Sequence, residues 1–152
     1  MKNFKNIAIL VSLDEKHVKE LSELKDSELL SHADNIYFVH IFSERSKKDL
    51  PLSVDSHDFE DVKHFVMDRL KELCTELVPS HHNENDERHC HCLFNSSEKI
   101  KVLDYLEEVK ADLVITSTKG EQGLEGVFKE SFSFWLVEHA PCDVLVVRPK
   151  KA

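Results

Sequence analysis

Long apolar runs are absent from this chain of 152 residues. The longest of them, such as residues 7–11, falls far short of the roughly 20 residues that a membrane-spanning helix needs, so we expect no association with a membrane. The opening residues also lack the extended apolar stretch that is typical of a signal peptide. We therefore expect a cytoplasmic protein.

Clusters of basic residues are also absent, apart from Arg148, Lys150 and Lys151 near the end of the sequence. The formal net charge is -9, with 29 acidic residues against 20 lysines and arginines. Nucleic-acid binding needs clustered Lys and Arg that neutralise phosphates, so we expect no nucleic-acid partner. The acidic excess favours solubility instead.

The sequence has no Cys-x-x-Cys motif, although it contains four cysteines. Disulfides are rare in the reducing cytoplasm, which makes a disulfide framework an unlikely use for them. We expect reduced, partly buried thiols. The four residues are Cys74, Cys90, Cys92 and Cys142.

Apolar runs and helical periods alternate along a length that suits a single domain, residues 1–152. Hydrophobic residues make up 41% of the chain, which is enough for a sizeable core. Nearly continuous apolar runs are typical of strands that are buried on both faces of a sheet. Five runs predict strands at residues 6–13, 35–42, 89–94, 112–117 and 143–148.

Helical periods lie between these runs. The clearest is an apolar stripe over 59–77 that steps by three or four residues and stops before Pro79. A shorter stripe covers 100–109, and Asn95 and Glu98 stand before it at the spacing of a capping box. The other segments are predicted helices within 15–31 and 124–139 and predicted loops near 43–57 and 80–88.

This alternation predicts an α/β fold, a three-layer open sheet of five parallel strands with helices on both faces. In such sheets a ligand binds beyond the carboxyl ends of the strands, near the point where the strand order reverses. The loops after Leu13 and Ser117 therefore form the candidate site. Asp14 ends the first strand at this edge, where aspartate also suits the cap of the next helix.

All three glycines, Gly120, Gly123 and Gly126, follow the fourth predicted strand. A glycine-rich loop between a strand and a helix can turn backbone N–H groups toward phosphates. A tight turn without any ligand fits the same residues, because glycine also supplies the backbone freedom that such turns need. Taken alone, the glycines leave both interpretations open.

Longer segments extend the signal around the glycines: residues 111–120, 123–124, 130–131 and 139–149, together with the first strand and its closing acid at 9–14. These segments resemble the universal stress protein family. The C-terminal third is the specific part, while the order of strands and helices matches across almost the whole chain. The resemblance implies a Rossmann-like fold of the adenine nucleotide alpha hydrolase-like type.

Nucleotide-binding members of this family carry the pattern Gly-x2-Gly-x9-Gly-Ser/Thr. With Gly120 as the second glycine, Ser117 stands at the first position, Glu130 at the third, and Ser131 keeps the hydroxyl. A carboxylate at the third position repels a polyphosphate by roughly 4 kcal/mol at about 4 Å and an effective dielectric near 20. Lys119 offsets part of this repulsion, but we expect no tightly bound nucleotide.

ATP or AMP remains the alternative ligand. The resemblance implies that Asp14 would contact the nucleoside part, and Ile41 would lie nearby, either as an apolar wall or simply as part of the core. The candidate degenerate cleft thus consists of Asp14, Ile41, Ser117, Lys119, Gly120, Glu130 and Ser131.

Family members without the full pattern do not bind ATP and act as homodimers, commonly through the last strand. Residues 143–148 are short and apolar and suit such an edge, although they also fit the last buried strand of a monomer. The resemblance therefore implies a non-catalytic, homodimeric stress-response protein that binds partners. The alternatives are a nucleotide switch with at most slow hydrolysis and a metal-responsive protein.

The metal alternative comes from a group of histidines and cysteines, because zinc prefers imidazole and thiolate ligands. On a strand, however, alternate side chains face opposite sides, so His89 and His91 would be separated from Cys90 and Cys92. Loop residues His81 and His82 could add to the histidine pair. We expect solvated histidines and no metal site.

Catalysis has no supporting motif. The hydroxyl candidates lie in no Gly-x-Ser-x-Gly elbow and no phosphate-binding P-loop. His40 and His139 lack a motif partner and are expected to be structural. We therefore expect no enzyme; the hydroxyls considered are Ser12, Ser117, Ser131 and Ser133.

Overall fold

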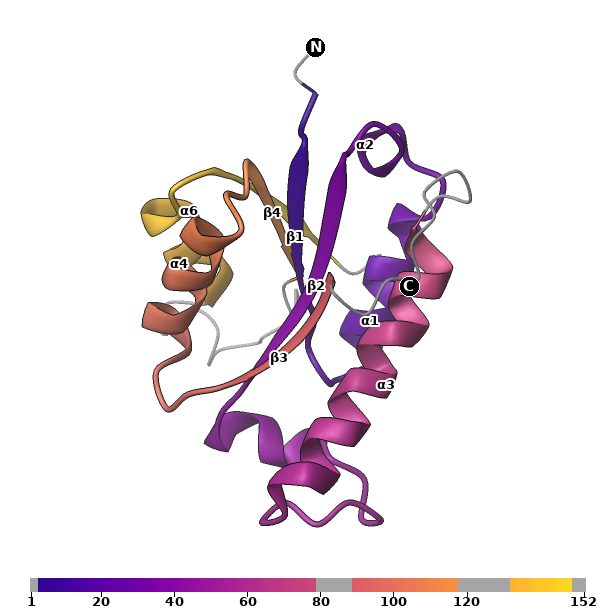
Figure 1. Ribbon diagram of the computed structural model, residues 1–152, viewed down its shortest axis with the longest axis vertical. Helices are drawn as coiled ribbons and strands as arrows, with labels where there is room; N and C mark the ends of the chain where they lie inside the picture. The colour runs from indigo at the N-terminus through magenta and orange to yellow at the C-terminus, as the bar shows by residue number, and fades with distance from the viewer. Residues whose placement is uncertain (1–2, 79–88, 118–131, 149–152) are drawn as a thin grey trace.

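The computed structural model describes residues 3–78, 89–117 and 132–148. Within them, one sheet of five strands carries helices on both faces (Figure 1). Neighbouring strands are all parallel, in the order β3-β2-β1-β4-β5, which confirms the predicted α/β fold. The strands are β1 (Asn6–Leu10), β2 (Asn35–Phe42), β3 (Cys90–Phe94), β4 (Leu113–Ser117) and β5 (Asp143–Val147).

The central strands are buried on both faces, as their continuous apolar sequences require. Ile7, Ala8 and Ile9 of β1 have no exposed surface. The strand ends at Leu10, earlier than the predicted run to residue 13. The side chains of Val11 and Leu13 are nevertheless buried in the core. The apolar run therefore predicted burial correctly and strand length less well.

The first helical layer covers one face of the sheet and consists of α1 (Glu15–Leu21), the 3-10 turn η1 (Ser22–Leu24), α2 (Glu28–Ser31) and α3 (Phe59–Leu77). The predicted stripe of α3 is buried against this face. The opposite face is covered by α4 (Glu98–Glu108) and α6 (Phe132–His139). Figure 1 shows these two layers on either side of the strands.

Two local predictions need correction. The predicted helix within 15–31 is interrupted, because Lys25 has an extended ψ of 135° and Asp26 a positive φ of 63°, after which Ser27 caps α2. The predicted loop 43–57 contains the 3-10 helix η2 (Glu44–Asp49). The segments predicted at 80–88 and 124–131, and Pro79, lie outside the described residues.

The capping box predicted before α4 was wrong. The helix begins at Glu98 with Ser97 at the N-cap position. Asn95 instead accepts a hydrogen bond from the backbone N–H of Ser97 at 2.8 Å. The Glu98 carboxylate instead accepts a hydrogen bond from the hydroxyl of Ser43, a residue 55 positions away. A tertiary contact thus replaces the local capping contact.

Asp112 ties the start of β4 to the start of β1. Its two carboxylate oxygens accept hydrogen bonds from the backbone N–H groups of Lys5 and Asn6, at 2.8 and 3.0 Å. The Asn6 side chain also donates to the carbonyl of Lys110 at 3.1 Å. These contacts fix the register of two neighbouring strands and so position their carboxyl ends side by side.

Candidate functional site

The reversal of strand order lies between β1 and β4. From β1 the chain builds outward through β2 and β3, whereas β4 and β5 extend the sheet in the other direction. A crevice at the carboxyl ends of these two strands is the place where open α/β sheets bind ligands. The predicted loops after Leu13 and Ser117 are therefore brought to the same edge.

Asp14 acts as the N-cap of α1. Its Oδ1 atom accepts a hydrogen bond from the backbone N–H of Lys16 at 3.0 Å. Its own backbone N–H donates to the Ser12 hydroxyl at 3.2 Å. Of the two roles considered for Asp14, the cap is thus observed in the structure, and a nucleoside contact stays a prediction.

Ser117 is paired with a histidine that the sequence patterns did not single out. The Ser117 Oγ lies 3.1 Å from Nδ1 of His17, 100 residues earlier in the chain. The Ser117 carbonyl accepts a hydrogen bond from the Ser133 hydroxyl at 3.2 Å. His17 follows the N-cap Asp14 by three residues and so stands in the first turn of α1, at the same edge of the sheet. That spacing is the only sequence signal that could have found it.

Ile41 lies near the carboxyl end of β2, beside Leu93 of β3. It is half-buried and packs against the hydrophobic cluster on the α4 side of the sheet. Packing against the core is therefore what the structure shows for Ile41, and an apolar wall beside a ligand stays a prediction. The remaining predicted cleft residues, Lys119, Gly120, Glu130 and Ser131, lie outside the described residues.

A buried histidine connects this end of the sheet to η2. His40 is 7% exposed, and its Nδ1 lies 2.7 Å from the Val11 carbonyl while its Nε2 lies 3.2 Å from the Ser46 hydroxyl. A carbonyl can only accept, so Nδ1 carries the proton and Nε2 accepts from Ser46. Burial lowers the pKa of His40, and the Val11 bond opposes this shift only in part.

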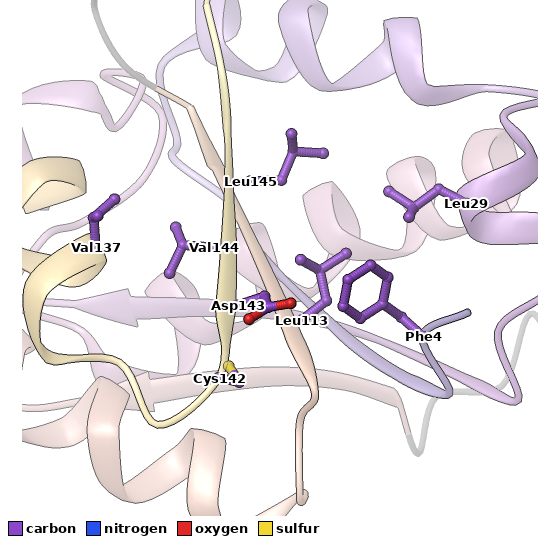
Figure 2. Close-up of a pocket in the computed structure, with 8 residues that line it drawn as sticks. All are labelled: Phe4, Leu29, Leu113, Val137, Cys142, Asp143, Val144 and Leu145. Carbon is purple, nitrogen blue, oxygen red and sulfur yellow. The ribbon is translucent and has the colours of Figure 1, made fainter. Parts of the chain in front are cut away.

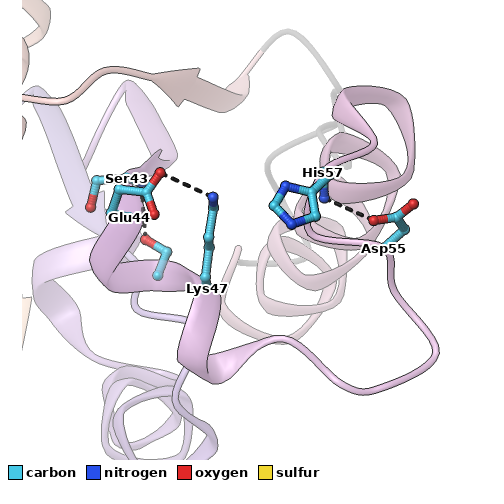
Figure 3. A network of polar contacts seen from close by, with 6 residues as sticks. Ser43, Glu44, Lys47, Asp55 and His57 are labelled. Carbon is cyan, nitrogen blue, oxygen red and sulfur yellow. Dashed lines mark hydrogen bonds and ion pairs between the residues drawn. The ribbon is translucent and has the colours of Figure 1, made fainter.

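Ser43 and Ser46 extend the contact toward α4. The Ser46 hydroxyl accepts from the backbone N–H of Ser43 at 3.2 Å, and the Ser43 hydroxyl donates to Glu98. The outer side of η2 carries an exposed ion pair between Lys47 and Glu44 at 3.0 Å (Figure 3). The polar groups at η2 thus form two sets. The buried hydroxyls of Ser43 and Ser46 hold η2 against β2 and α4, whereas Glu44 and Lys47 form an ion pair on its outer side.

The histidines and cysteines of β3 face opposite sides, as predicted. The His91 Nδ1 lies 2.7 Å from the Tyr105 hydroxyl under α4, whereas Cys90 and Cys92 pack on the side of α3. Burial raises the pKa of Cys92 to about 12. No cluster of three or more His, Cys, Asp or Glu placed to hold a metal occurs in the described parts of the chain, and His81 and His82 fall outside them.

The strand β5 forms one edge of the sheet and is only partly covered. From Val144 to Val147 its side chains are half-buried, and Asp143 is exposed. An open pocket of about 490 Å³ surrounds its first half (Figure 2). The pocket is lined by Phe4, Leu29, Leu113, Val137, Cys142, Asp143, Val144 and Leu145.

A five-stranded parallel sheet with a helical layer on each face and one reversal of strand order defines the class of Rossmann-like α/β proteins. The pattern of the universal stress protein family matches residues 4–148. The chain therefore belongs to the universal stress protein family.

Relatives and solved structures agree with this assignment. A protein of Staphylococcus aureus strain USA300 that is named for this family is 28% identical over 99% of the chain and 88% of its own length. A Staphylococcus epidermidis protein with the same family name is 29% identical with the same coverage. Both alignments thus extend beyond the C-terminal signature.

Among solved structures, a universal stress protein in complex with cAMP has a TM-score of 0.61 at 12% identity, covering 98% of this chain and 100% of that one. The universal stress protein of Archaeoglobus fulgidus has a TM-score of 0.56 at 13% identity, with coverages of 95% and 94%. At these identities the likeness concerns the fold.

Within the described residues, no helix has both the length and the apolar character needed to cross a membrane.

Proposed function

We propose that this protein is a non-catalytic, cytoplasmic stress-response protein that works as a homodimer and binds partners through its dimer and loop surfaces. Its crevice does not hold a nucleoside triphosphate tightly. The family membership supports the stress-response role, and the half-covered edge strand β5 is the observation that carries the homodimer.

An edge strand presents unpaired backbone groups that can bind a further strand. The strand β5 is hydrogen-bonded to β4 on one side, and no other strand of the described residues pairs with it. In Figure 2, Val137 and Val144 lie to one side of β5, and Leu145 lies with Phe4 and Leu113 to the other. A second copy related by a two-fold axis would pair its own β5 with this β5. The partner would then cover the apolar side chains on both sides of the strand.

Val146 offers a direct test of this dimer, because it is half-buried and belongs to neither hydrophobic core cluster. Light scattering after size-exclusion chromatography measures the mass of the parent and of Val146→Lys. We expect a dimer for the parent and a monomer for the variant. Thr75→Lys, an exposed position on α3 with the same charge change, is the matched control and stays dimeric. A monomeric parent at about 100 μM would reject the proposal.

A second function, nucleotide binding in the crevice, is favoured by the similar structure that is in complex with cAMP. We infer that ATP or AMP would bind between Asp14, Ser117 and the segment with Lys119, Gly120, Glu130 and Ser131. This function requires the residues at the first and third glycine positions to leave room for phosphate.

Calorimetry of the parent against ATP and AMP decides between the two functions. We expect weak or no ATP binding by the parent and a gain for the double variant Ser117→Gly with Glu130→Gly. Native mass spectrometry of freshly purified protein checks for a carried nucleotide. Sub-micromolar ATP binding by the parent, or a nucleotide that survives purification, would make the nucleotide switch the main function.

A further inference from the structure

We propose that η2 is an acid-released latch: the neutral ring of His40 holds it on the sheet, and protonation of that ring frees it while the rest of the fold stays closed. This inference goes beyond the proposed function, because it involves neither the homodimer nor a nucleotide. It gives the segment after β2 a shape that depends on pH.

The hydrogen bonds around His40 fix the position of each proton between β1 and η2. The Val11 carbonyl can only accept, and it lies 2.7 Å from Nδ1, so Nδ1 carries the proton of the neutral ring. Nε2 is then an acceptor and receives the Ser46 hydroxyl at 3.2 Å. The Ser46 oxygen in turn accepts from the backbone N–H of Ser43 at 3.2 Å. This arrangement exists only while the ring is uncharged.

Protonation of Nε2 sets two donors against each other. The new N–H points at the Ser46 oxygen, which already accepts from Ser43, and the hydroxyl hydrogen loses the nitrogen to which it was bonded. His40 and Ser46 are each only 7% exposed, so water has little access to them while η2 is in place. A buried charge without solvent is costly as well. Movement of η2 away from the sheet relieves both penalties, because it admits water to the ring and to the hydroxyl.

The charges that face His40 decide how strongly the closed latch resists the proton. Glu98 of α4 and Asp49 of η2 favour the charged ring, but burial outweighs them, and the pKa of His40 is lowered. Beside His40 on β3 lies Cys92, whose pKa burial raises to about 12, so that its thiol is neutral. Lys63 of α3 acts on this thiol and adds no negative charge. The closed form therefore disfavours the proton, and an open form in water does not.

η2 is attached less firmly than the elements around it. Ser46 is the only residue of η2 that is buried, whereas α3 buries its whole apolar stripe. The outer side of η2 carries an exposed ion pair, which contributes little to stability (Figure 3). Further attachments are the hydrogen bond of Ser43 to Glu98 before η2 and the partly buried Leu50 after it. Segments with few buried apolar contacts open at a lower free energy than the whole fold, so η2 can be released by itself.

Hydrogen exchange of the backbone amides, followed by mass spectrometry between pH 5 and 8, measures the release of η2. The protection factor of residues 43–50 reports the latch, and that of residues 62–77 in α3 reports the fold. Both are corrected for the intrinsic effect of pH on exchange. His40→Asn keeps a side-chain N–H for the Val11 carbonyl but cannot take up a proton. His64→Gln, at an exposed position of α3, is the matched control.

In the parent, the protection of 43–50 should fall by up to about tenfold per pH unit between 6.5 and the lowered pKa of His40, because the open form binds a proton that the closed form does not. Protection should stay constant in His40→Asn, while His64→Gln follows the parent. Residues 62–77 should remain at least about tenfold more protected than 43–50 throughout. If circular dichroism shows that His40→Asn does not fold, Ser46→Ala replaces it. That variant should lower the protection of 43–50 at pH 8 and reduce its change with pH.

Three results would overturn the latch. They are a protection of 43–50 in the parent that does not change with pH, the same change with pH in His40→Asn, and equal protection of 43–50 and 62–77 at each pH. The last result would show that η2 leaves the sheet only when the whole fold opens. A monomeric parent would contradict the proposed homodimer but would leave this test unaffected, so the two failures are distinguishable.

Discussion

His40 of β2 and Ser46 of η2 are joined inside the protein by a hydrogen bond of 3.2 Å between the imidazole Nε2 and the hydroxyl Oγ. The other imidazole nitrogen is fixed on the Val11 carbonyl, so the bond requires a neutral ring. Protonation would place a hydrogen on Nε2 where the serine hydroxyl now donates. The contact between the end of β1 and η2 therefore depends on the charge state of one side chain.

The stability of the protein should fall in mild acid because of His40. Burial lowers its pKa below the ordinary value of 6.5, and Glu98 and Asp49 only partly oppose this shift. In the window from 6.5 down to the lowered pKa, the unfolded chain binds a proton that the folded chain does not. The free energy of unfolding therefore decreases as the pH falls through this window and is fully retained above it.

Urea unfolding between pH 5 and 8 measures this effect. We expect His40→Asn to be less stable than the parent at pH 8, with the difference narrowing toward pH 5. His64→Gln, at a surface position whose side chain is 81% exposed, is the matched control and should keep the parent's loss of stability in acid. A constant difference between parent and His40→Asn would contradict the role assigned to His40.

Ser46→Ala should destabilise the protein by about 1–3 kcal/mol. The substitution removes the buried hydroxyl that the backbone N–H of Ser43 and the ring of His40 both use. Ser53→Ala, at an exposed position in the connection before α3, is the control and should change stability by less than about 0.5 kcal/mol. Equal unfolding midpoints in urea for the parent and Ser46→Ala would show that water replaces the hydroxyl.

Leu70→Ala should cost about 2–5 kcal/mol of unfolding free energy. Leu70 lies on the buried stripe of α3 and has no exposed surface, so the truncation leaves a cavity against the sheet. Leu52→Ala removes the same atoms from a fully exposed side chain and should be nearly neutral. Denaturant midpoints of the two variants provide the comparison, and similar losses would mean that α3 is not packed as described.

Cys92 and Cys142 should react slowly with thiol reagents in the folded protein at pH 8. Burial raises the pKa of Cys92 to about 12 and that of Cys142 to about 11, and only the thiolate is nucleophilic. Alkylation followed by peptide mass spectrometry gives the rate at each site. Unfolding in urea should accelerate both reactions by at least about tenfold. Rapid labelling of Cys92 in the folded state would contradict its half-buried position against α3.

The sheet could be predicted from the sequence because burial on both faces demands continuous apolar runs. Residues 35–42 became β2 over their full length, and the stripe at 59–77 became α3. These signals are local, since each follows from the spacing of apolar residues within one element. The interruption of the helix was not predicted, because it depends on the backbone dihedral angles of Lys25 and Asp26, and neither residue type requires those angles.

The site was predicted only in outline. The edge of the sheet and Ser117 followed from the order of elements, but His17 did not, because its partner lies 100 residues away. The contact of Glu98 with Ser43 defeated the predicted capping box for the same reason. Side-chain pairs between distant segments depend on how the folded elements pack against one another. The spacing of residues along the chain therefore cannot predict them.

The place of β1 in the sheet has a consequence for synthesis on the ribosome. Of the five strands of this sheet, the middle one, β1, is made first, and it pairs with β2 early but with β4 only after residue 113 has been made. Asp112, which clamps the start of β1, arrives at the same late stage. Until then, the edge of β1 that later pairs with β4 has no neighbouring strand. A nascent chain stalled before residue 112 would therefore expose this edge to chaperones and to other nascent chains.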